Sequence, residues 1–276
     1  MTPARPYPRP LLLRIAAREH WIGAACLALM CGLAWWWLWR ISALDMSSSA
    51  MDAMGMAGPM QHGARPDIWS ATYLGPAFAM WAIMMVAMML PSASPMILLH
   101  ATLSQRGTSP THSATLAFAL AYLLVWTAFA AFAAIAQAML VSRGLVEAAT
   151  LAFGRRWIGV ALLAATAFYQ VSSLKDVCLS ACRSPVSFLM RHWRPGISGA
   201  VRMGLIHGLY CLGCCGFLML LLFIGGVMNV SWIAGIAAFV AVEKLAPAHS
   251  IVSRAAGVLL VVWGMATWLA AAVGFH

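Results

Sequence analysis

The sequence predicts an all-α protein, a polytopic bundle of about seven transmembrane helices. Of its 276 residues, 63% are hydrophobic and 9% are charged, whereas a soluble domain carries about 25% charged residues. Apolar stretches of about 20 residues, the length that crosses a bilayer as a helix, recur from end to end. A helix satisfies its own backbone polar groups in lipid, so these stretches are expected to be helical. We expect a single transmembrane domain over 21–276, with no room for a separate soluble domain.

The first apolar stretch, 21–39, follows a basic segment, 1–20, that carries four arginines. No small-residue cleavage site ends it cleanly, so we expect a retained first helix, not a removed signal peptide. The other six stretches follow at 70–90, 114–141, 157–177, 199–227, 232–246 and 255–275. Tryptophans lie at the edges of four of them, where amphipathic rings prefer the membrane interface. The stretch at 232–246 is short, so six spans plus a re-entrant helix is the alternative.

The basic residues predict the orientation of the chain. Twelve of the 17 lysines and arginines fall in the segments that share a side with the N-terminus. Because positive charge is retained on the cytoplasmic side, this asymmetry predicts that 1–20 is cytoplasmic and that 41–68 is a periplasmic loop. The formal net charge of +10 lies between apolar stretches, where it sets topology and meets anionic headgroups. Nucleic-acid binding is therefore not expected.

The string GLYCLGCCG, residues 208–216, holds three of the seven cysteines in five positions. At about 100° per helical residue, a sector of about 120° contains five soft or borderline ligands. They are Met203, His207, Cys211, Cys214 and Cys215. Thiolate, thioether and imidazole suit Cu(I) or, as the alternative, zinc. Free cysteine also packs as a small hydrophobic residue, but an intramembrane histidine is costly enough to indicate function.

A methionine-rich stretch, MWAIMMVAMMLP, occupies residues 80–91. Its thioethers form two neighbouring stripes on a helix and are neutral soft ligands that suit Cu(I). The candidate ligands are Met80, Met84, Met85, Met88 and Met89. Methionine also fills irregular gaps in a core, and taken alone this stretch is explained that way. Pro91 and Pro95 are expected to stop or kink the helix just beyond it.

The predicted periplasmic loop contains a second set of methionines in a flexible segment rich in Ser, Gly, Ala and Pro. Methionines in such a segment have no core to fill, and their spacing with a histidine resembles the copper-capturing segments of periplasmic copper proteins. We expect metal capture by Met46, Met51, Met54, Met56, Met60 and His62. The alternative is a disordered linker whose methionine content is accidental.

The segment YQVSSLKDVCLSACRSP, residues 169–185, carries a lysine and two cysteines. If its helix continues, Lys175, Cys178 and Cys182 lie within about 60° of one another. An ammonium group favours a neighbouring thiolate. The two cysteines are therefore candidate metal ligands, or else a redox pair that lacks the usual two-residue spacing.

Four charged residues are expected at a similar depth in two of the predicted spans. Lys175 and Asp176 lie in the fourth span, and the string VEKLAP places Glu243 and Lys244 at the end of the sixth. Unpaired charges are costly in lipid, so we expect these residues to pair across helices. A structural ion-pair clamp and a proton or ion relay both remain open.

The chain resembles the bacterial family of predicted metal-binding integral membrane proteins, catalogued as a domain of unknown function. The likeness rests on AMWAIMMVAMMLPSASPM, YQVSSLKDVCLSACRSP, GLIHGLYCLGCCGFLMLLLFIGGVMN and VEKLAP, and it runs over about 69–247. It implies a multi-span bacterial inner-membrane protein with suspected metal binding, copper handling having been proposed for some relatives. The family-like residues are Met84, Met85, Met88, Met89, Pro91, Gln170, Lys175, Cys178, Cys182, His207, Cys211, Cys214, Cys215, Glu243 and Lys244. The chain departs at Gly216 and Phe217, where relatives often carry a bulky aromatic residue, and neither is a proposed ligand.

The residues and the resemblance favour a metal-binding inner-membrane protein that captures Cu(I) and holds or transfers it for delivery, insertion or transport. The expected partners are membrane lipid and a periplasmic copper protein or membrane cuproenzyme. One alternative is a membrane thiol-redox or electron-transfer protein that uses the cysteines, and a second is a non-catalytic assembly scaffold. No catalytic residue is assigned. The sequence has no nucleotide-binding loop and no aspartyl-phosphate motif, so an ATP-driven pump is not expected.

Overall fold

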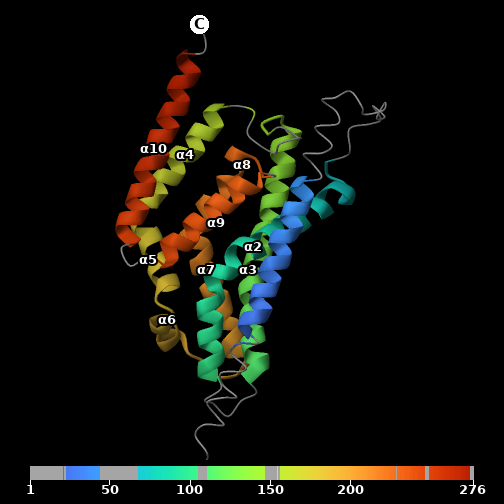
Figure 1. The fold of residues 1–276 in the computed structure, drawn as a ribbon, viewed down its shortest axis with the longest axis vertical. Coiled ribbons are helices and arrows are strands. Elements are labelled where there is room, and N and C mark those ends of the chain that lie inside the picture. Colours follow the sequence, from blue (N-terminus) through green and yellow to red (C-terminus); the bar gives the residue numbers. More distant parts are fainter. Residues whose placement is uncertain are drawn as a thin grey trace, which may run out of the picture.

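The described part of the chain is entirely helical apart from short connections, as the sequence predicts. The computed structural model describes residues 21, 23–43, 68–104, 111–146, 154, 156–227, 229–245 and 249–273. Within these ranges there is no β-strand, and the long helices lie beside one another as a bundle (Figure 1). The prediction of an all-α helix bundle is therefore confirmed.

An N-terminal helix, Gly23–Ala43, precedes nine labelled helices among the described residues. In chain order the labelled helices are α2 (Ala71–Ser104), α3 (Thr111–Ser142), α4 (Arg156–Gln170), α5 (Ser173–Arg183), α6 (Pro185–His192), α7 (Gly196–Leu220), α8 (Leu222–Gly225), α9 (Val230–Leu245) and α10 (His249–Val273). Each of the seven predicted stretches coincides with one or more of these helices.

Four helical segments in the described residues are long and apolar enough to cross a membrane. They are the N-terminal helix, α2, α3 and the segment Gly196–Gly225 that joins α7 to α8. The predicted span at 157–177 is instead divided into α4 and α5, which are bent by 66° and make a fifth crossing if they form one span. The short sixth stretch is α9, whose 16 residues fall below the roughly 20 that a crossing needs.

Two local sequence features shape these helices. Ser172 is the N-cap residue of α5, and its side chain accepts a hydrogen bond from the Lys175 backbone N–H, which caps the new helix after the break. Pro91 and Pro95 do not end α2, which continues to Ser104 and changes direction along its course (Figure 1). A proline inside a helix removes one backbone hydrogen bond, so a bend without termination is its expected effect when neighbouring helices support both halves.

The centre of the bundle is formed by α2, α3 and α7. Helix α3 packs along both other helices, while α5 lies on α7 and α10 lies on α4. Two glycines of α7 allow the close approach of α3. A Cβ at Gly204 would meet the carbonyl oxygen of Phe118, and a Cβ at Gly208 would lie 2.8 Å from Cγ2 of Val125. Small residues at such crossings let membrane helices come into contact.

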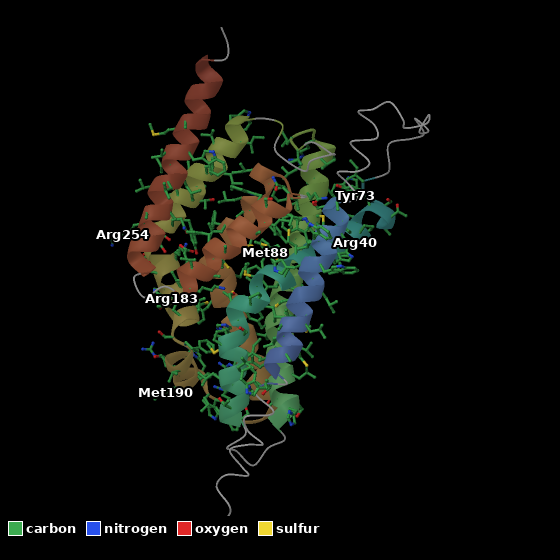
Figure 2. The ribbon with its side chains drawn as sticks, in the orientation of Figure 1. Arg40, Tyr73, Met88, Arg183, Met190 and Arg254 are labelled. Atoms are coloured by element: carbon green, nitrogen blue, oxygen red, sulfur yellow. The ribbon has the colours of Figure 1, made fainter. Side chains whose placement is uncertain are left out.

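The interior and the outer faces of the bundle differ in polarity and burial, in a way that is compatible with a membrane protein. Inside, Trp81 donates from Nε1 to Oε1 of Gln137 at 2.8 Å. Met88 is also inside and 2% exposed, whereas Met190 lies at the edge and is 80% exposed (Figure 2). Large apolar side chains such as Leu124 are exposed on the outer faces. Buried polar contacts such as the Trp81–Gln137 hydrogen bond lie inside the bundle, and the outer faces suit contact with lipid.

Candidate metal centre

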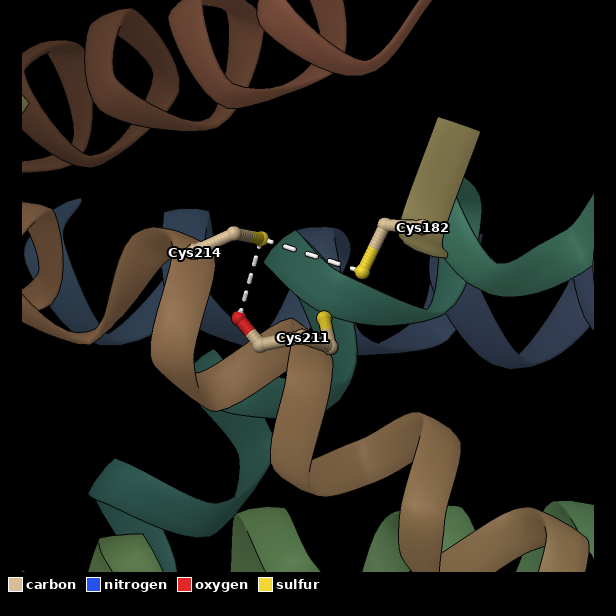
Figure 3. A group of neighbouring side chains, drawn as sticks. All are labelled: Cys182, Cys211 and Cys214. Atoms are coloured by element: carbon tan, nitrogen blue, oxygen red, sulfur yellow. Dashed lines mark hydrogen bonds between the residues drawn. The ribbon is translucent and has the colours of Figure 1, made fainter. Parts of the chain in front are cut away.

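Three cysteines from two helices form a cluster in the interior of the bundle. Cys182 comes from α5, and Cys211 and Cys214 come from α7; their three Sγ atoms all lie within 4.8 Å of one another (Figure 3). The Sγ atoms of Cys214 and Cys182 are 3.9 Å apart. Both α7 cysteines are buried, and Cys182 is half-buried. We call these three residues the cysteine cluster.

The geometry of the cysteine cluster follows from two local features of the sequence. Cys211 and Cys214 are three residues apart, so they lie on one face of α7. Cys182 reaches them because α5 approaches α7 closely at Gly213, where an added Cβ would lie 2.6 Å from Sγ of Cys178. The absence of a side chain at Gly213 therefore sets the distance between the two helices that supply the sulfur atoms.

A buried ammonium group and a phenol face the sulfur of Cys211. Lys244 of α9 donates from Nζ to Sγ of Cys211 at 3.0 Å and to Oγ of Ser92 at 2.9 Å. The hydroxyl of Tyr122 lies 3.1 Å from the same sulfur. A cation and a hydrogen-bond donor at these distances stabilise negative charge on sulfur. The cluster thus has a positive counter-charge within the bundle. This charge comes from Lys244 on α9, whereas the cysteines are on α5 and α7.

Cys215 lies beside the cluster and contacts the methionine-rich helix. Its thiol lies 3.7 Å from Sδ of Met89, and it also donates to the carbonyl oxygen of Cys211 at 2.9 Å. The thiol of Cys214 donates to the same carbonyl at 3.1 Å. The remaining methionines of the α2 stretch are buried as well: Met80, Met84, Met85 and Met88. The structure therefore connects the methionine stretch to the cysteines through the Met89–Cys215 contact.

His207 lies outside the cysteine cluster. Its ring packs against three aromatic rings, with centroid distances of 5.6 Å to Tyr122, 5.3 Å to Phe188 and 6.1 Å to Phe118. Met203, one turn earlier in α7, is 1% exposed. Cys178 is likewise outside the cluster, since its sulfur packs on the backbone of α7. The five ligands that share one sector of α7 are thus divided among different neighbouring helices.

The four charged residues divide into an ion pair, a sulfur contact and an exposed carboxylate. Lys175 is fully buried and donates from Nζ to both carboxylate oxygens of Glu243, at 2.6 and 2.8 Å. Gln170 bridges the pair by hydrogen bonds to Lys175 and to Glu243, and Ser253 donates to the same carboxylate at 2.9 Å. Asp176 is exposed and does not join this group. The network connects α4, α5, α9 and α10 next to the cluster.

Three residues around the site were not singled out from the sequence. Tyr122 and Ser92 contact the cluster or its lysine, and His100 of α2 is buried in the same half of the bundle as His207. A tyrosine in an apolar stretch was an available indication, because a buried phenol requires a hydrogen-bond partner. The predicted capture residues Met46, Met51, Met54, Met56, Met60 and His62 lie outside the described residues.

Comparison with known proteins relates the chain to a family. The family model PpoB2, whose description is copper chaperone, matches residues 78–267. The matched range includes the cysteine cluster, Lys244, the whole methionine stretch and the Lys175–Glu243 pair. No curated protein and no solved structure matches the chain.

Proposed function

The chain belongs to the PpoB2 family of copper chaperones, and from this premise we propose that it holds Cu(I) at the cysteine cluster within a membrane and passes the ion to another copper protein. The observation that carries the proposal is the convergence of three sulfur atoms within 4.8 Å of one another from two separate helices. Soft sulfur ligands select soft ions, whereas hard ions require oxygen ligands.

The composition of the cysteine cluster supports Cu(I) rather than zinc. A structural zinc site is almost always closed by four ligands in a tetrahedron. Among the described residues, the cluster contains three cysteine sulfurs and neither a histidine nor a carboxylate. A site of three sulfurs suits an ion that accepts a low coordination number. The ammonium group of Lys244 beside Cys211 offsets the negative charge that thiolates bring into the interior of the bundle.

We propose that the ion reaches the cluster through methionines. Met89 contacts Cys215, and the buried methionines of α2 continue from this contact toward the N-terminal end of the helix. Thioethers bind Cu(I) without deprotonation, so a stripe of them allows transfer between weak ligands. In this proposal the loop at 41–68 is periplasmic and captures the ion, and the N-terminus is cytoplasmic. The membrane is then a bacterial inner membrane, and the recipient is a periplasmic copper protein or a membrane cuproenzyme.

The experiment is a Cu(I) titration of the full chain in detergent, under anaerobic and reducing conditions, against a chromogenic Cu(I) chelator. We expect the wild type to bind one Cu(I) ion per chain with high affinity, which we call the tight equivalent. In Cys182→Ser we expect binding that is at least a hundredfold weaker. Cys178→Ser is the matched control, because Cys178 lies one turn earlier on the same helix but outside the cluster. Full retention of the tight equivalent in Cys182→Ser and in Cys211→Ser would contradict the proposal.

A second experiment tests the route of entry. Deletion of residues 46–62 is expected to slow loading at low copper concentration while leaving the affinity of the tight equivalent unchanged. The measurement is the rate at which the coloured Cu(I)–chelator complex loses its copper to the protein after mixing, compared between the deletion variant and the wild type. An unchanged loading rate would remove the capture loop from the proposal without affecting the cluster.

One observation favours a second candidate function, thiol redox chemistry. The sulfurs of Cys182 and Cys214 are 3.9 Å apart on different helices, and a disulfide needs about 2.05 Å, so a small shift of α5 would bring them to bonding distance. Thiol alkylation followed by intact mass measurement separates the two functions. A copper-free chain that forms this disulfide quantitatively under mild oxidation, and that binds no Cu(I) when reduced, would favour redox chemistry.

A further inference from the structure

Two buried histidines from different helices share one aromatic neighbour. His100 of α2 is 1% exposed and His207 of α7 is 3% exposed. The ring of Phe118 lies 4.9 Å from the His100 ring and 6.1 Å from the His207 ring, and both pairs are stacked. Buried imidazoles inside a membrane bundle are costly, so two of them around one ring require an explanation.

Each of these histidines has a methionine one turn earlier on its own helix. Met96 precedes His100 by four residues in α2, and Met203 precedes His207 by four residues in α7. Residues four apart lie on one face of a helix, so each pair presents a thioether and an imidazole to the same side. Both methionines are buried, at 2% and 1% exposure. The bundle therefore contains two Met–His pairs.

One imidazole nitrogen in these pairs has no hydrogen-bond partner. Nδ1 of His207 is buried and unpaired within the described residues, whereas Nδ1 of His100 lies 3.3 Å from Oγ1 of Thr115. Leaving a buried polar atom unpaired destabilises the folded state. A nitrogen kept in this condition, on the same face as a thioether, points to a ligand that it binds in another state of the protein.

The surroundings of His207 suit a cation. Its ring is packed among the rings of Phe118, Tyr122 and Phe188, at centroid distances of 5.3–6.1 Å. Aromatic faces attract cations, and the attraction is strongest where water is excluded. The same Tyr122 lies 3.1 Å from the sulfur of Cys211, so the histidine is next to the cysteine cluster without belonging to it.

We infer that the two Met–His pairs form a second Cu(I)-binding region, weaker than the cysteine cluster, through which the ion passes between the cluster and the end of the bundle where α2 ends and α3 begins. In the proposed orientation this end is cytoplasmic, so the region serves a membrane cuproenzyme as recipient and not a periplasmic protein. His207 and Met203 are the pair next to the cluster, and His100 and Met96 follow toward that end. All four ligands are neutral, so they bind Cu(I) less tightly than thiolates and release it faster. The inference goes beyond the proposed function because it adds a binding region, and it takes the identity of the ion from that function.

The first test removes the cysteine cluster and asks what remains. The variant Cys182→Ser, Cys211→Ser, Cys214→Ser is titrated with Cu(I) in detergent under anaerobic conditions. We expect one weaker equivalent whose X-ray absorption spectrum shows nitrogen as well as sulfur ligands. Adding His207→Gln is expected to weaken this equivalent at least tenfold, whereas adding His112→Gln, an exposed histidine of α3, leaves it unchanged. The inference would be overturned if the triple variant bound no Cu(I), or if His207→Gln left its remaining binding unchanged.

The second test keeps the cluster and therefore does not depend on the folding of the triple variant. Met203→Leu and Met96→Leu conserve size and apolar character and remove only the thioether. In each variant we expect the tight equivalent to keep its affinity, and its release to excess chelator in stopped flow to slow about tenfold. Unchanged release in both variants would refute the pathway. A wild type without a tight equivalent would instead refute the proposed function, so the two failures are distinguishable.

Discussion

Replacement of Glu243 by Gln tests how the buried ion pair holds the site together. The substitution keeps the shape of the side chain and removes its charge. Lys175 would then keep a buried ammonium group whose remaining partners are neutral. Because this pair joins α5, which carries Cys182, to α9, which carries Lys244, its loss is expected to lower the free energy of unfolding of the whole bundle.

The magnitude follows from burial and distance. Lys175 is 0% exposed and Glu243 is 2% exposed, so water and salt do not screen the pair as they screen a surface ion pair. At 2.6 Å, with an effective dielectric constant of about 20, the Coulomb attraction is about 6 kcal/mol, and the cost of desolvating both groups offsets part of it. Removing one partner of a buried pair typically costs about 3–5 kcal/mol, and this is the expected loss.

The assay is SDS-induced unfolding in mixed micelles, followed by circular dichroism of the helices. Asp176→Asn is the matched control, because it removes an exposed carboxylate next to Lys175 in the chain and should cost under about 1 kcal/mol. The double variant Lys175→Met, Glu243→Leu should recover most of the lost stability, since an apolar pair of similar volume leaves no buried charge unpaired. A change below about 1 kcal/mol in Glu243→Gln would refute the assignment of the pair as a clamp.

Three further predictions concern the site and the core. Gly213→Ala would place a Cβ 2.6 Å from a cysteine sulfur of α5 and should weaken Cu(I) binding about tenfold in chelator competition, while Gly216→Ala, whose nearest neighbouring atom is at 3.4 Å, should not. Lys244→Met removes the counter-charge at Cys211 and should weaken the same equivalent about tenfold or more, with Lys244→Arg retaining part of it. Trp81→Phe breaks a buried hydrogen bond and should cost about 1–2 kcal/mol more in SDS unfolding than Trp126→Phe, whose indole nitrogen has no partner in the described residues. Equal losses in the two tryptophan variants would contradict that difference.

The helical fold and the sulfur-rich composition of the interior were predictable because both depend on local pattern. Long apolar stretches require helices in lipid, and the spacing of Cys211 and Cys214 places them on one face of whatever helix carries them. The break after Gln170 was not predicted, although Ser172 is a common capping residue. An apolar stretch of the right length gives no sign of such a break, because apolar periodicity continues on both sides of it.

The sequence could not predict which neighbouring helix lies against each part of this face of α7. On a helical wheel, His207, Cys211 and Cys215 fall in one sector, so a common pocket is the simplest expectation. In the bundle, Cys211 faces Lys244 of α9, Cys215 faces Met89 of α2, and His207 packs between rings of α3 and α6. Which helix lies against each part of the sector depends on contacts between segments far apart in the chain, and periodicity carries no information about them.

The separate origin of Cys182 bears on how a copper ion would leave the proposed site. Cys211 and Cys214 share α7, whose 25 residues are held along α3, whereas Cys182 is carried by α5, which has 11 residues and is bent by 66° from α4. A displacement of α5, which would also break its ion pair with α9, would reduce the coordination of the site from three sulfurs to two and leave the spacing of the other two intact. An incoming donor from a recipient can then take the vacated coordination position. If the cluster is the copper site proposed above, hand-over requires the withdrawal of one short helix, and the long helices stay where they are.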